Sequence, residues 1–205
     1  EGPQILIYHT HSQEAFKDSG PQGRTIVEVG DYLAELLTQK GYRVYHDTSV
    51  YDLQSGVLDR SKAYNYALEG VNRILQQNPS IQVVLDLHRD GVSENLHMVS
   101  DINGKPTAQI MFFNGLSRTP EGKIAYLSNP YLAENLAFSL KMQLGAQAYF
   151  PGFARKIYLK GLRYNLHLRP KSALIEAGAQ TNTFEEVKNA MEPLAQLLDM
   201  VLQGE

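Results

Sequence analysis

Apolar and polar residues follow one another along the chain in blocks that predict strands and helices in turn. Short apolar runs typical of buried strands lie at Ile5–Tyr8, 81–88 and 173–176, and a shorter one lies at 42–46. The run at 81–88 is almost continuously apolar, which is typical of a central strand covered on both faces. Segments with apolar residues at helical spacing predict helices at 26–39, 60–77, 131–147 and 183–202.

Glycine, proline and capping residues mark the ends of several of these helices. Gly41 follows the first helical segment and Pro79 follows the second, as expected at helix ends. Thr183, with Glu186 three residues later, predicts a capping box at the start of the last helix. Segments 96–99 and 109–113 flank Asn103-Gly104 and are expected to form an antiparallel hairpin or meander, whereas 151–169 is the least regular stretch.

Repeated strand–helix alternation with long connections predicts one α/β domain over residues 1–205. The expected core is a mainly parallel, mixed and twisted sheet of about six strands, with helices on both faces and the hairpin as an antiparallel edge. In such sheets, ligands bind beyond the carboxyl ends of the strands.

Composition narrows the functional classes. The 205 residues are 43% hydrophobic and carry a net charge of −3. The chain is not basic overall, so its charge does not indicate nucleic-acid binding. No apolar stretch approaches the roughly 20 residues that span a bilayer. The absence of cysteine excludes disulfides and thiolate ligands. Because the chain starts almost directly at its first strand, we expect it to be a domain of a longer protein with a native anchor or signal.

Ionisable residues follow three of the predicted strands. The first strand precedes His9-Thr10-His11 and Glu14, the second ends in His88-Arg89-Asp90, and the last ends in Glu176. The ends of parallel strands lie at a common edge, so these residues should converge. His11, Glu14 and His88 would form a metal site of the kind that holds Zn²⁺ and leaves one position for water.

The choice between His9 and His11 stays open at this stage. If the strand continued through them, both would point to the same side. We favour His11, because its three-residue spacing from Glu14 lets both side chains reach one ion from a turn. His9 is then expected to contact a ligand or the substrate.

Glu176 is the candidate general base, because a carboxylate at a strand end can take a proton from water and deliver it to a leaving amine. Asp86 and Asp90 are expected to orient His88. The alternatives are a buried His88 without a catalytic role and a structural Glu176 paired with Arg89 or Arg169.

Other polar residues give weaker signals. His46 and His97 lack ligand spacing, and we interpret both as structural or surface residues. His167, in the irregular stretch, is a candidate for a substrate groove. The basic residues of 155–163 are either a solvated surface or the lining of a groove for an anionic polymer.

Three motifs resemble the stage II sporulation protein P family. They are His9-Thr10-His11-Ser12-Gln13-Glu14-Ala15-Phe16, Asp86-Leu87-His88-Arg89-Asp90, and Leu174-Ile175-Glu176-Ala177-Gly178 followed by Asn182-Thr183 and Glu185-Glu186. The motifs occur in the family's order over nearly the whole chain. One departure is Tyr164-Asn165-Leu166-His167, where the family pattern is Tyr-Asn-Gln-Asp. Asn165 and Asn182, which lie in family-like segments, are expected to contact the ligands or the substrate.

This resemblance implies a zinc amidase-like fold and a peptidoglycan hydrolase. The family is related to zinc-dependent N-acetylmuramoyl-L-alanine amidases, whose first strand ends in a metal-binding His where His11 stands and whose last strand carries a Glu base that matches Glu176. The implied reaction cuts the amide between N-acetylmuramic acid and L-alanine, and action on peptide cross-links is also attributed to the family.

The implied setting is engulfment during sporulation. The resemblance places the protein outside the cytoplasmic membrane, in the space between forespore and mother cell, held by an N-terminal anchor. It implies stage II sporulation proteins D and M as partners.

In the expected mechanism, Glu176 transfers the proton while Arg89 and the metal stabilise the oxyanion. Two rival functions share these residues. One is a zinc carboxypeptidase or aminoacylase acting on small peptides or amides, and the other is a non-catalytic peptidoglycan-binding module.

Overall fold

The computed structural model describes residues 2–204, and its centre is a six-stranded sheet in the order β11-β8-β12-β5-β1-β2. The strands are β1 (Ile5–Tyr8), β2 (Val44–His46), β5 (Val83–Asp90), β8 (Ile110–Gly115), β11 (Tyr158–Lys160) and β12 (Lys171–Ala179). The pairs β2–β1, β1–β5 and β5–β12 are parallel, whereas β8 is antiparallel to β12 and parallel to β11. The carboxyl ends of β1, β5 and β12 therefore lie at one edge.

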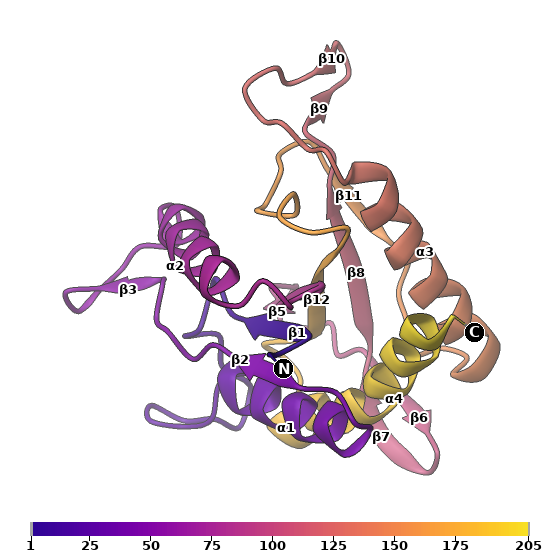
Figure 1. The fold of residues 1–205 in the computed structure, drawn as a ribbon. Coiled ribbons are helices and arrows are strands. Elements are labelled where there is room, and N and C mark those ends of the chain that lie inside the picture. The colour runs from indigo at the N-terminus through magenta and orange to yellow at the C-terminus, as the bar shows by residue number, and fades with distance from the viewer. Residues whose placement is uncertain (1, 205) are drawn as a thin grey trace.

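Helices cover both faces of the sheet, as expected (Figure 1). They are α1 (Ile26–Gln39), α2 (Ala63–Gln77), α3 (Leu132–Tyr149) and α4 (Phe184–Gln203). The larger hydrophobic core joins α1, α3 and α4 to one face, where Ile5, Ile7 and Leu85 point. The smaller core joins α2 to the opposite face, where Leu6 and Val84 point.

Three small ribbons extend from this body: β3 (Leu53–Gln54) with β4 (Val57–Leu58), β6 (Val99–Ile102) with β7 (Lys105–Ala108), and β9 (Arg118–Thr119) with β10 (Gly122–Lys123). The β9–β10 ribbon projects furthest, at the top of Figure 1. No helix in the described part of the chain is both long enough and apolar enough to cross a membrane.

The predicted strand at 5–8 and helix at 26–39 are confirmed residue for residue, and the other three helices are confirmed with ends shifted by one to three residues. The capping box at Thr183 is present, with its hydroxyl accepting from the Glu186 amide. The central strand covers Val83–Asp90 rather than 81–88.

The hairpin was predicted with the wrong strands. The turn at Asn103-Gly104 connects Val99–Ile102 to Lys105–Ala108, which form a separate two-stranded sheet. The predicted second arm belongs instead to β8, whose Ile110, Phe112 and Met111 are buried in the main sheet. Consequently the antiparallel element is not an edge: β11 lies outside it, within the stretch predicted to be irregular.

Candidate functional site

Residues from three adjacent strands come together on the face of the sheet that α2 covers. Glu176 on β12 is paired in register with His88 on β5, and β1 is the next strand on the other side of β5. Side chains alternate between faces along a strand. Asp86 and His88 therefore lie on the same face as Val84, toward α2.

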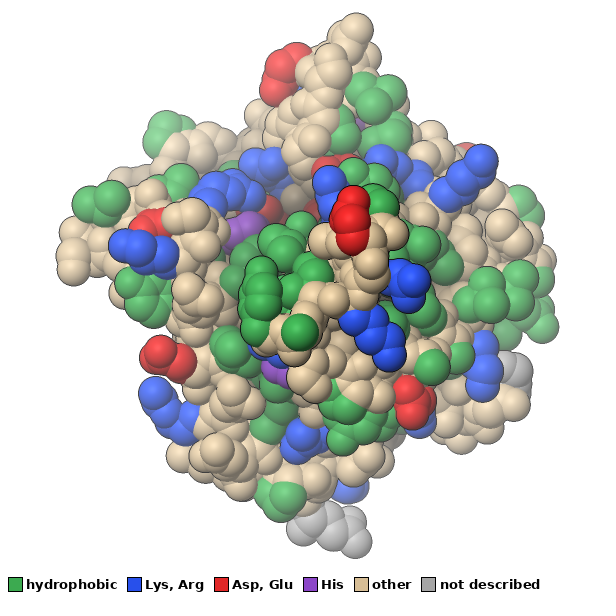
Figure 2. Space-filling view, turned by 90° about the horizontal axis from the view of Figure 1, so that it is seen from above, with side chains coloured by type: hydrophobic (Ala, Val, Ile, Leu, Met, Phe, Trp, Pro, Cys, Tyr) green, Lys and Arg blue, Asp and Glu red, His purple; other side chains and the backbone are tan. Residues whose placement is uncertain are grey.

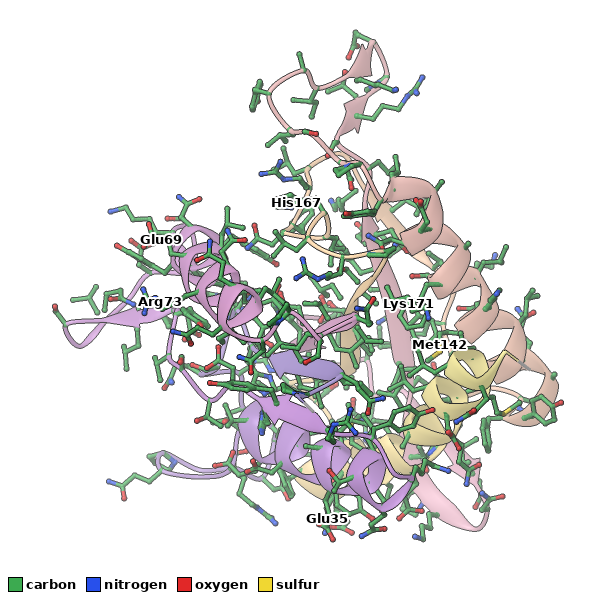
Figure 3. All side chains as sticks on the ribbon, in the orientation of Figure 1. Glu35, Glu69, Arg73, Met142, His167 and Lys171 are labelled. Atoms are coloured by element: carbon green, nitrogen blue, oxygen red, sulfur yellow. The ribbon has the colours of Figure 1, made fainter. Side chains whose placement is uncertain are left out.

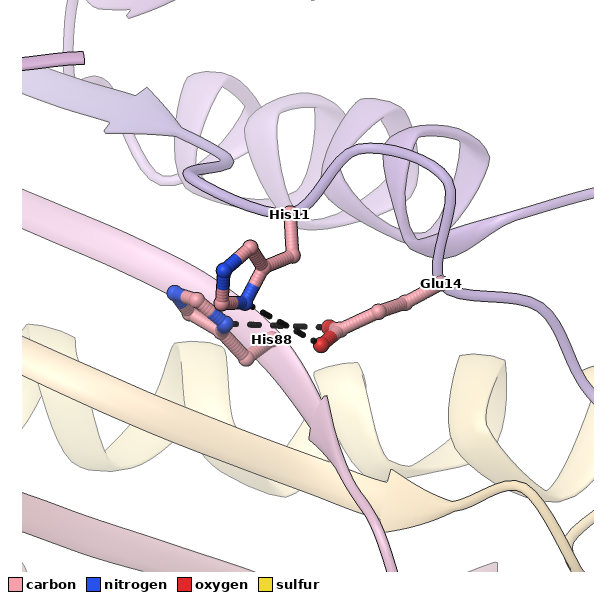
Figure 4. Close-up of side chains that lie close together, drawn as sticks. All are labelled: His11, Glu14 and His88. Carbon is pink, nitrogen blue, oxygen red and sulfur yellow. Dashed lines mark ion pairs between the residues drawn. The ribbon is translucent and has the colours of Figure 1, made fainter. Parts of the chain in front are cut away.

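His11, Glu14 and His88 form a compact group of three donors (Figure 4). Their ligand atoms lie within 4.8 Å of one another. Nδ1 of His11 is 3.5 Å from Oε1 of Glu14, and Nδ1 of His88 is 3.7 Å from Oε2. The two imidazoles meet edge to face, with ring centroids 5.0 Å apart. Two imidazole nitrogens and one carboxylate are a donor set typical of catalytic zinc, and these three residues could hold such an ion.

Glu14 is buried, with only 2% of its side chain exposed, yet both of its oxygens are bound. The Arg89 amide donates to Oε2 at 2.8 Å, and Nη2 of Arg60 donates to Oε1 at 2.7 Å. Burial alone would raise the pKa of Glu14. The charge of His88 and the hydrogen bonds to the carboxylate outweigh burial, so the pKa lies well below its usual range and Glu14 stays ionised.

Asp86 connects β1 to His88. It is fully buried and accepts from the amide and the hydroxyl of Thr10, at 2.9 and 2.6 Å. Its Oδ1 also lies 2.8 Å from Nε2 of His88. Burial acts to lower the pKa of His88, but the charges of Asp86 and Glu14 raise it well above its usual value. A carboxylate behind the second ring nitrogen is the arrangement that orients a metal-binding histidine.

Glu176 lies beside this group without a hydrogen-bond or ion-pair partner among residues 2–204. Its Oε2 is buried and accepts no hydrogen bond from any described residue. Burial, followed by the charges of Glu14, Asp90 and Asp86, raises its pKa to about 7 despite the opposing effect of His88. Neither arginine of the structural alternative reaches it, since Arg89 donates to the carbonyls of Ala15 and Asp90, and Arg169 donates to those of Ile81 and Leu168.

The structure places His9 away from the group. Its Nδ1 bonds to the Leu87 carbonyl at 2.8 Å, and its Nε2 lies 2.8 Å from Nε2 of His46. His46 in turn bonds to Asp31 at 2.9 Å. Burial lowers the pKa of His9 to about 4. His9 therefore points to the α1 face, whereas His11 joins His88 on the other.

Aromatic residues form one wall of the site. Tyr64, in the first turn of α2, lies over His88 with nearly parallel rings 6.4 Å apart and meets His11 edge to face at 5.4 Å. Tyr164 meets Tyr64 at 5.4 Å, and the Asn165 amide donates to the Tyr64 carbonyl at 2.8 Å. Both Tyr164 and Asn165 have positive φ, at 52° and 57°. These contacts hold the loop after β11 against the start of α2.

The other predicted residues have structural contacts. Asp90 does not contact His88, because its carboxylate bonds to Arg155 at 2.7 Å and to the Gly91 amide. Asn182 is buried, and its side chain accepts from the Ala179 amide and donates to the Met98 carbonyl. His167 lies in the loop on the α2 side of the sheet (Figure 3), and its Nδ1 is buried without a hydrogen bond to any described residue.

Arg60 and Tyr64 were not identified from sequence as members of this site. Arg60 comes just before α2, and Tyr64 fits the apolar spacing of that helix, so the pattern favours a core role for it. No short-range signal in the sequence links either of them to His11 or Glu14, which are about 50 residues away.

Comparison with known proteins gives a consistent family and fold. The family model described as stage II sporulation protein P matches residues 1–199. Stage II sporulation protein P of Bacillus subtilis (strain 168) is 23% identical over 93% of this chain and 49% of that protein. The chain thus spans about half the length of this curated relative.

Two amidases are among the solved structures with a similar fold. The CwlD amidase of Clostridioides difficile, solved in complex with the GerS lipoprotein, has a TM-score of 0.61 at 14% identity, with 98% of this chain and 96% of that chain covered. The N-acetylmuramoyl-L-alanine amidase AmiC2 of Nostoc punctiforme has a TM-score of 0.57 at 15% identity, with 99% of both chains covered. These similarities show a shared α/β fold, and the family match over nearly the whole length shows that the chain belongs to the stage II sporulation protein P family.

Proposed function

We propose that this chain is the catalytic domain of a zinc-dependent peptidoglycan hydrolase that cleaves the amide between N-acetylmuramic acid and L-alanine. The observation that carries the proposal is the register pairing of Glu176 with His88, beside His11 and Glu14. This pairing puts an unpartnered carboxyl group next to three donors suited to zinc. The family and the amidase-like fold support the same reading.

In this proposal, His11, Glu14 and His88 would hold the zinc ion. Zinc bound there would supply Lewis-acid polarisation of the amide carbonyl and a water of lowered pKa. Asp86 and the Arg89 amide fix the orientation of His88 and Glu14, so the donors are positioned before any ion arrives.

Glu176 is the proposed general base and acid. In the metal-free chain its pKa is about 7, near neutral pH, where a carboxyl group can both accept and return a proton. It accepts the proton of the attacking water and donates it to the nitrogen of the departing L-alanine. The Arg89 side chain is already bound to the Ala15 and Asp90 carbonyls, so we assign Arg89 a positioning role through its amide rather than the expected contact with the oxyanion.

The setting follows from the family alone. We propose an extracytoplasmic protein that acts on the septal wall during engulfment, between the membranes of forespore and mother cell. Peptidoglycan is the proposed substrate, and stage II sporulation proteins D and M are the proposed partners.

Digestion of intact sacculi tests the reaction. The proposal predicts new muramic lactyl carboxylates and new L-alanine amino termini in equal amounts. Release of free C-terminal amino acids instead would indicate a carboxypeptidase, and cleaved cross-links an endopeptidase. Sedimentation with sacculi that survives chelation, without soluble product, would indicate a binding module.

The Glu176→Gln variant tests the assignment of the base. We expect it to bind zinc as the native chain does and to lose about 10²–10⁴-fold in cleavage rate, since the proton carrier is gone. A Glu69→Gln variant on the exposed side of α2 is the matched control. A normal rate in Glu176→Gln with zinc bound would show that another group carries the proton.

A further inference from the structure

The charges of this chain are strongly segregated. Residues 102–175 hold ten Lys or Arg residues and only two Asp or Glu residues, whereas the rest of the chain holds nine and twenty. The overall charge of −3 conceals this asymmetry. A strongly basic segment in an otherwise acidic chain indicates an interaction with a polyanion.

Backbone contacts bring four of these cations together. Arg118 and Lys123 face each other in the β9–β10 ribbon. The Arg118 amide donates to the Gly161 carbonyl, and the Leu116 amide donates to that of Lys160. Nη1 of Arg163 donates to the Ser128 carbonyl at 2.8 Å. We call Arg118, Lys123, Lys160 and Arg163 the basic ribbon face.

Three of these side chains are open to a ligand, whereas Arg163 has its Nη1 bound to the Ser128 carbonyl. Arg118, Lys123 and Lys160 are exposed, and Arg163 is partly exposed. Among residues 2–204, none of the four forms an ion pair. Figure 2, which looks down on the molecule from above, shows several Lys and Arg side chains near the middle of the view, with an acidic side chain between them.

A groove runs along the base of the ribbon. Its volume is about 600 Å³, and Arg118 and Lys123 line it on one side. Its other lining residues are mostly apolar, among them Leu116, Ile124, Leu127, Leu132 and Leu136, and three are polar: Ser117, Ser128 and Asn129. A groove with apolar, polar and basic side chains suits a chain with ring or alkyl groups and negatively charged substituents.

The basic ribbon face is connected to the catalytic group by the loop after β11. Arg163 immediately precedes Tyr164, which contacts Tyr64, and Tyr64 contacts His11. The close approach of Gly115 fixes the loop, because a Cβ there would lie 2.4 Å from the Leu162 carbonyl oxygen. A long polymer placed at Glu176 that followed this loop past Tyr64 and Tyr164 would reach Arg163.

We infer that the basic ribbon face binds a carboxylate-bearing stretch of peptidoglycan that extends away from the bond being cut. This inference rests on the proposed function, since the stem peptides of that substrate supply the carboxylates. The continuity with the reaction site favours the substrate polymer over a membrane surface, which would not need a path to Glu176.

Sedimentation with sacculi freed of teichoic acid tests the inference. The native chain is compared with the triple variant Arg118→Gln, Lys123→Gln, Lys160→Gln, all in a Glu176→Gln background so that the sacculi stay intact. We expect the triple variant to bind at least about tenfold more weakly and with less dependence on salt, because three screened attractions are lost. The control Lys40→Gln, Lys105→Gln, Lys188→Gln removes the same charge from the C-cap of α1, from β7 and from α4.

Equal binding by the triple variant and the control would overturn the inference, provided both melt at the native temperature. So would binding that appears only when teichoic acid is left on the sacculi. Binding of the face to vesicles of anionic phospholipid, with sacculi binding unaffected, would assign it to a membrane instead. These outcomes are separate from the proposed function, which fails only if the unmutated chain releases no muramic lactyl ends.

Discussion

Glu176 is an acidic side chain held where its ionised form is disfavoured. Burial is the largest contribution to its raised pKa of about 7, and nearby carboxylates add to it. A buried polar atom usually has a hydrogen-bond partner, but Oε2 of Glu176 accepts no hydrogen bond from a described residue. A side chain that lowers the stability of the fold and has a pKa near neutral pH is more typical of a catalytic residue than of a structural one.

This cost should be measurable as a pH-dependent difference in stability. The folded chain holds the Glu176 proton up to about pH 7, whereas the unfolded chain releases it near 4.5. The unfolding free energy of the metal-free native chain should therefore fall as pH rises between these values, relative to Glu176→Gln. Urea unfolding at pH 5 and pH 8 measures the difference, with Glu69→Gln as the control. If the native chain and Glu176→Gln differed in unfolding free energy by the same amount at both pH values, this result would contradict the raised pKa.

Asp86 should affect metal binding without being a ligand. Replacing it with Asn keeps the size but removes the charge that faces Nε2 of His88. We expect Asp86→Asn to lower zinc affinity by about 10–100-fold, as for other carboxylates that orient a metal-binding histidine. Competition with a chelating dye measures this affinity. The control is Asp101→Asn, at an exposed position of β6. An unchanged affinity in Asp86→Asn would show that the Asp86 charge does not orient His88 for metal binding.

At the scale of single elements, the end of β1 separates His9 from His11. The strand stops at Tyr8, so the alternation of faces holds through His9 and fails in the following turn. His9 continues toward α1, and the turn carries His11 to the opposite face. From sequence, both would share one side only if the strand continued through them, and His11 was favoured because it could reach the ion from a turn. The hydrogen bonds of Thr10 to Asp86 set that end, and they depend on a residue 76 positions away.

Helix α1 has a glycine, Gly30, where the His9–His46 pair packs against it. A Cβ at Gly30 would lie 2.6 Å from Nε2 of His9 and 2.7 Å from Nε2 of His46. Alanine is the better helix former by about 1 kcal/mol, but overpacking costs about 1–3 kcal/mol. We therefore expect Gly30→Ala to lower the unfolding free energy.

Gly145→Ala in α3 is the matched control for Gly30→Ala, since its Cβ would meet only Leu197, at 3.0 Å. That flexible side chain can shift, so this variant should be neutral or slightly stabilised in urea unfolding. If Gly30→Ala were as stable as Gly145→Ala, the histidine pair would have room to move and would not be a fixed part of the fold.

Buried and amphipathic elements could be predicted from sequence, as could the short strand β2, whereas the exposed strand β11 could not. β1 and β5 carry continuous apolar runs, and α4 has both an apolar face and a capping box. In contrast, β11 is exposed along its whole length, so its residues give no alternating pattern. The hairpin arms were misplaced because the run at β8 satisfies a hairpin as well as a central strand.

At the scale of the whole molecule, the two faces of the sheet have different roles. Three helices and the larger core cover one face, which holds the fold together. One helix and an irregular loop cover the other, and this face carries Glu14, His88 and Glu176. The strand ends that converge there were predictable because parallel strands share an edge. Arg60, Tyr64 and the loop after β11 were not, because their approach depends on tertiary contacts.

The same division separates the candidate catalytic group from the basic ribbon face. Tyr64 and Tyr164 wall the site on one side, and the basic ribbon face lies beyond them. Catalysis by the rigid strand ends and binding by the projecting ribbon would then be separable functions of one domain.

The most direct test of the account is the rate at which chelated protein cleaves the muramoyl–L-alanine amide as zinc is added back. The account predicts that activity returns to saturation at one zinc per chain. In His11→Ala, activity at the same zinc should stay lower by more than about 100-fold, because one of three ligands is lost. His97→Ala, whose exposed side chain pairs with Glu186 instead, should respond as the native chain does. Full activity in chelated native protein, or a normal zinc response in His11→Ala, would contradict the proposed metal site.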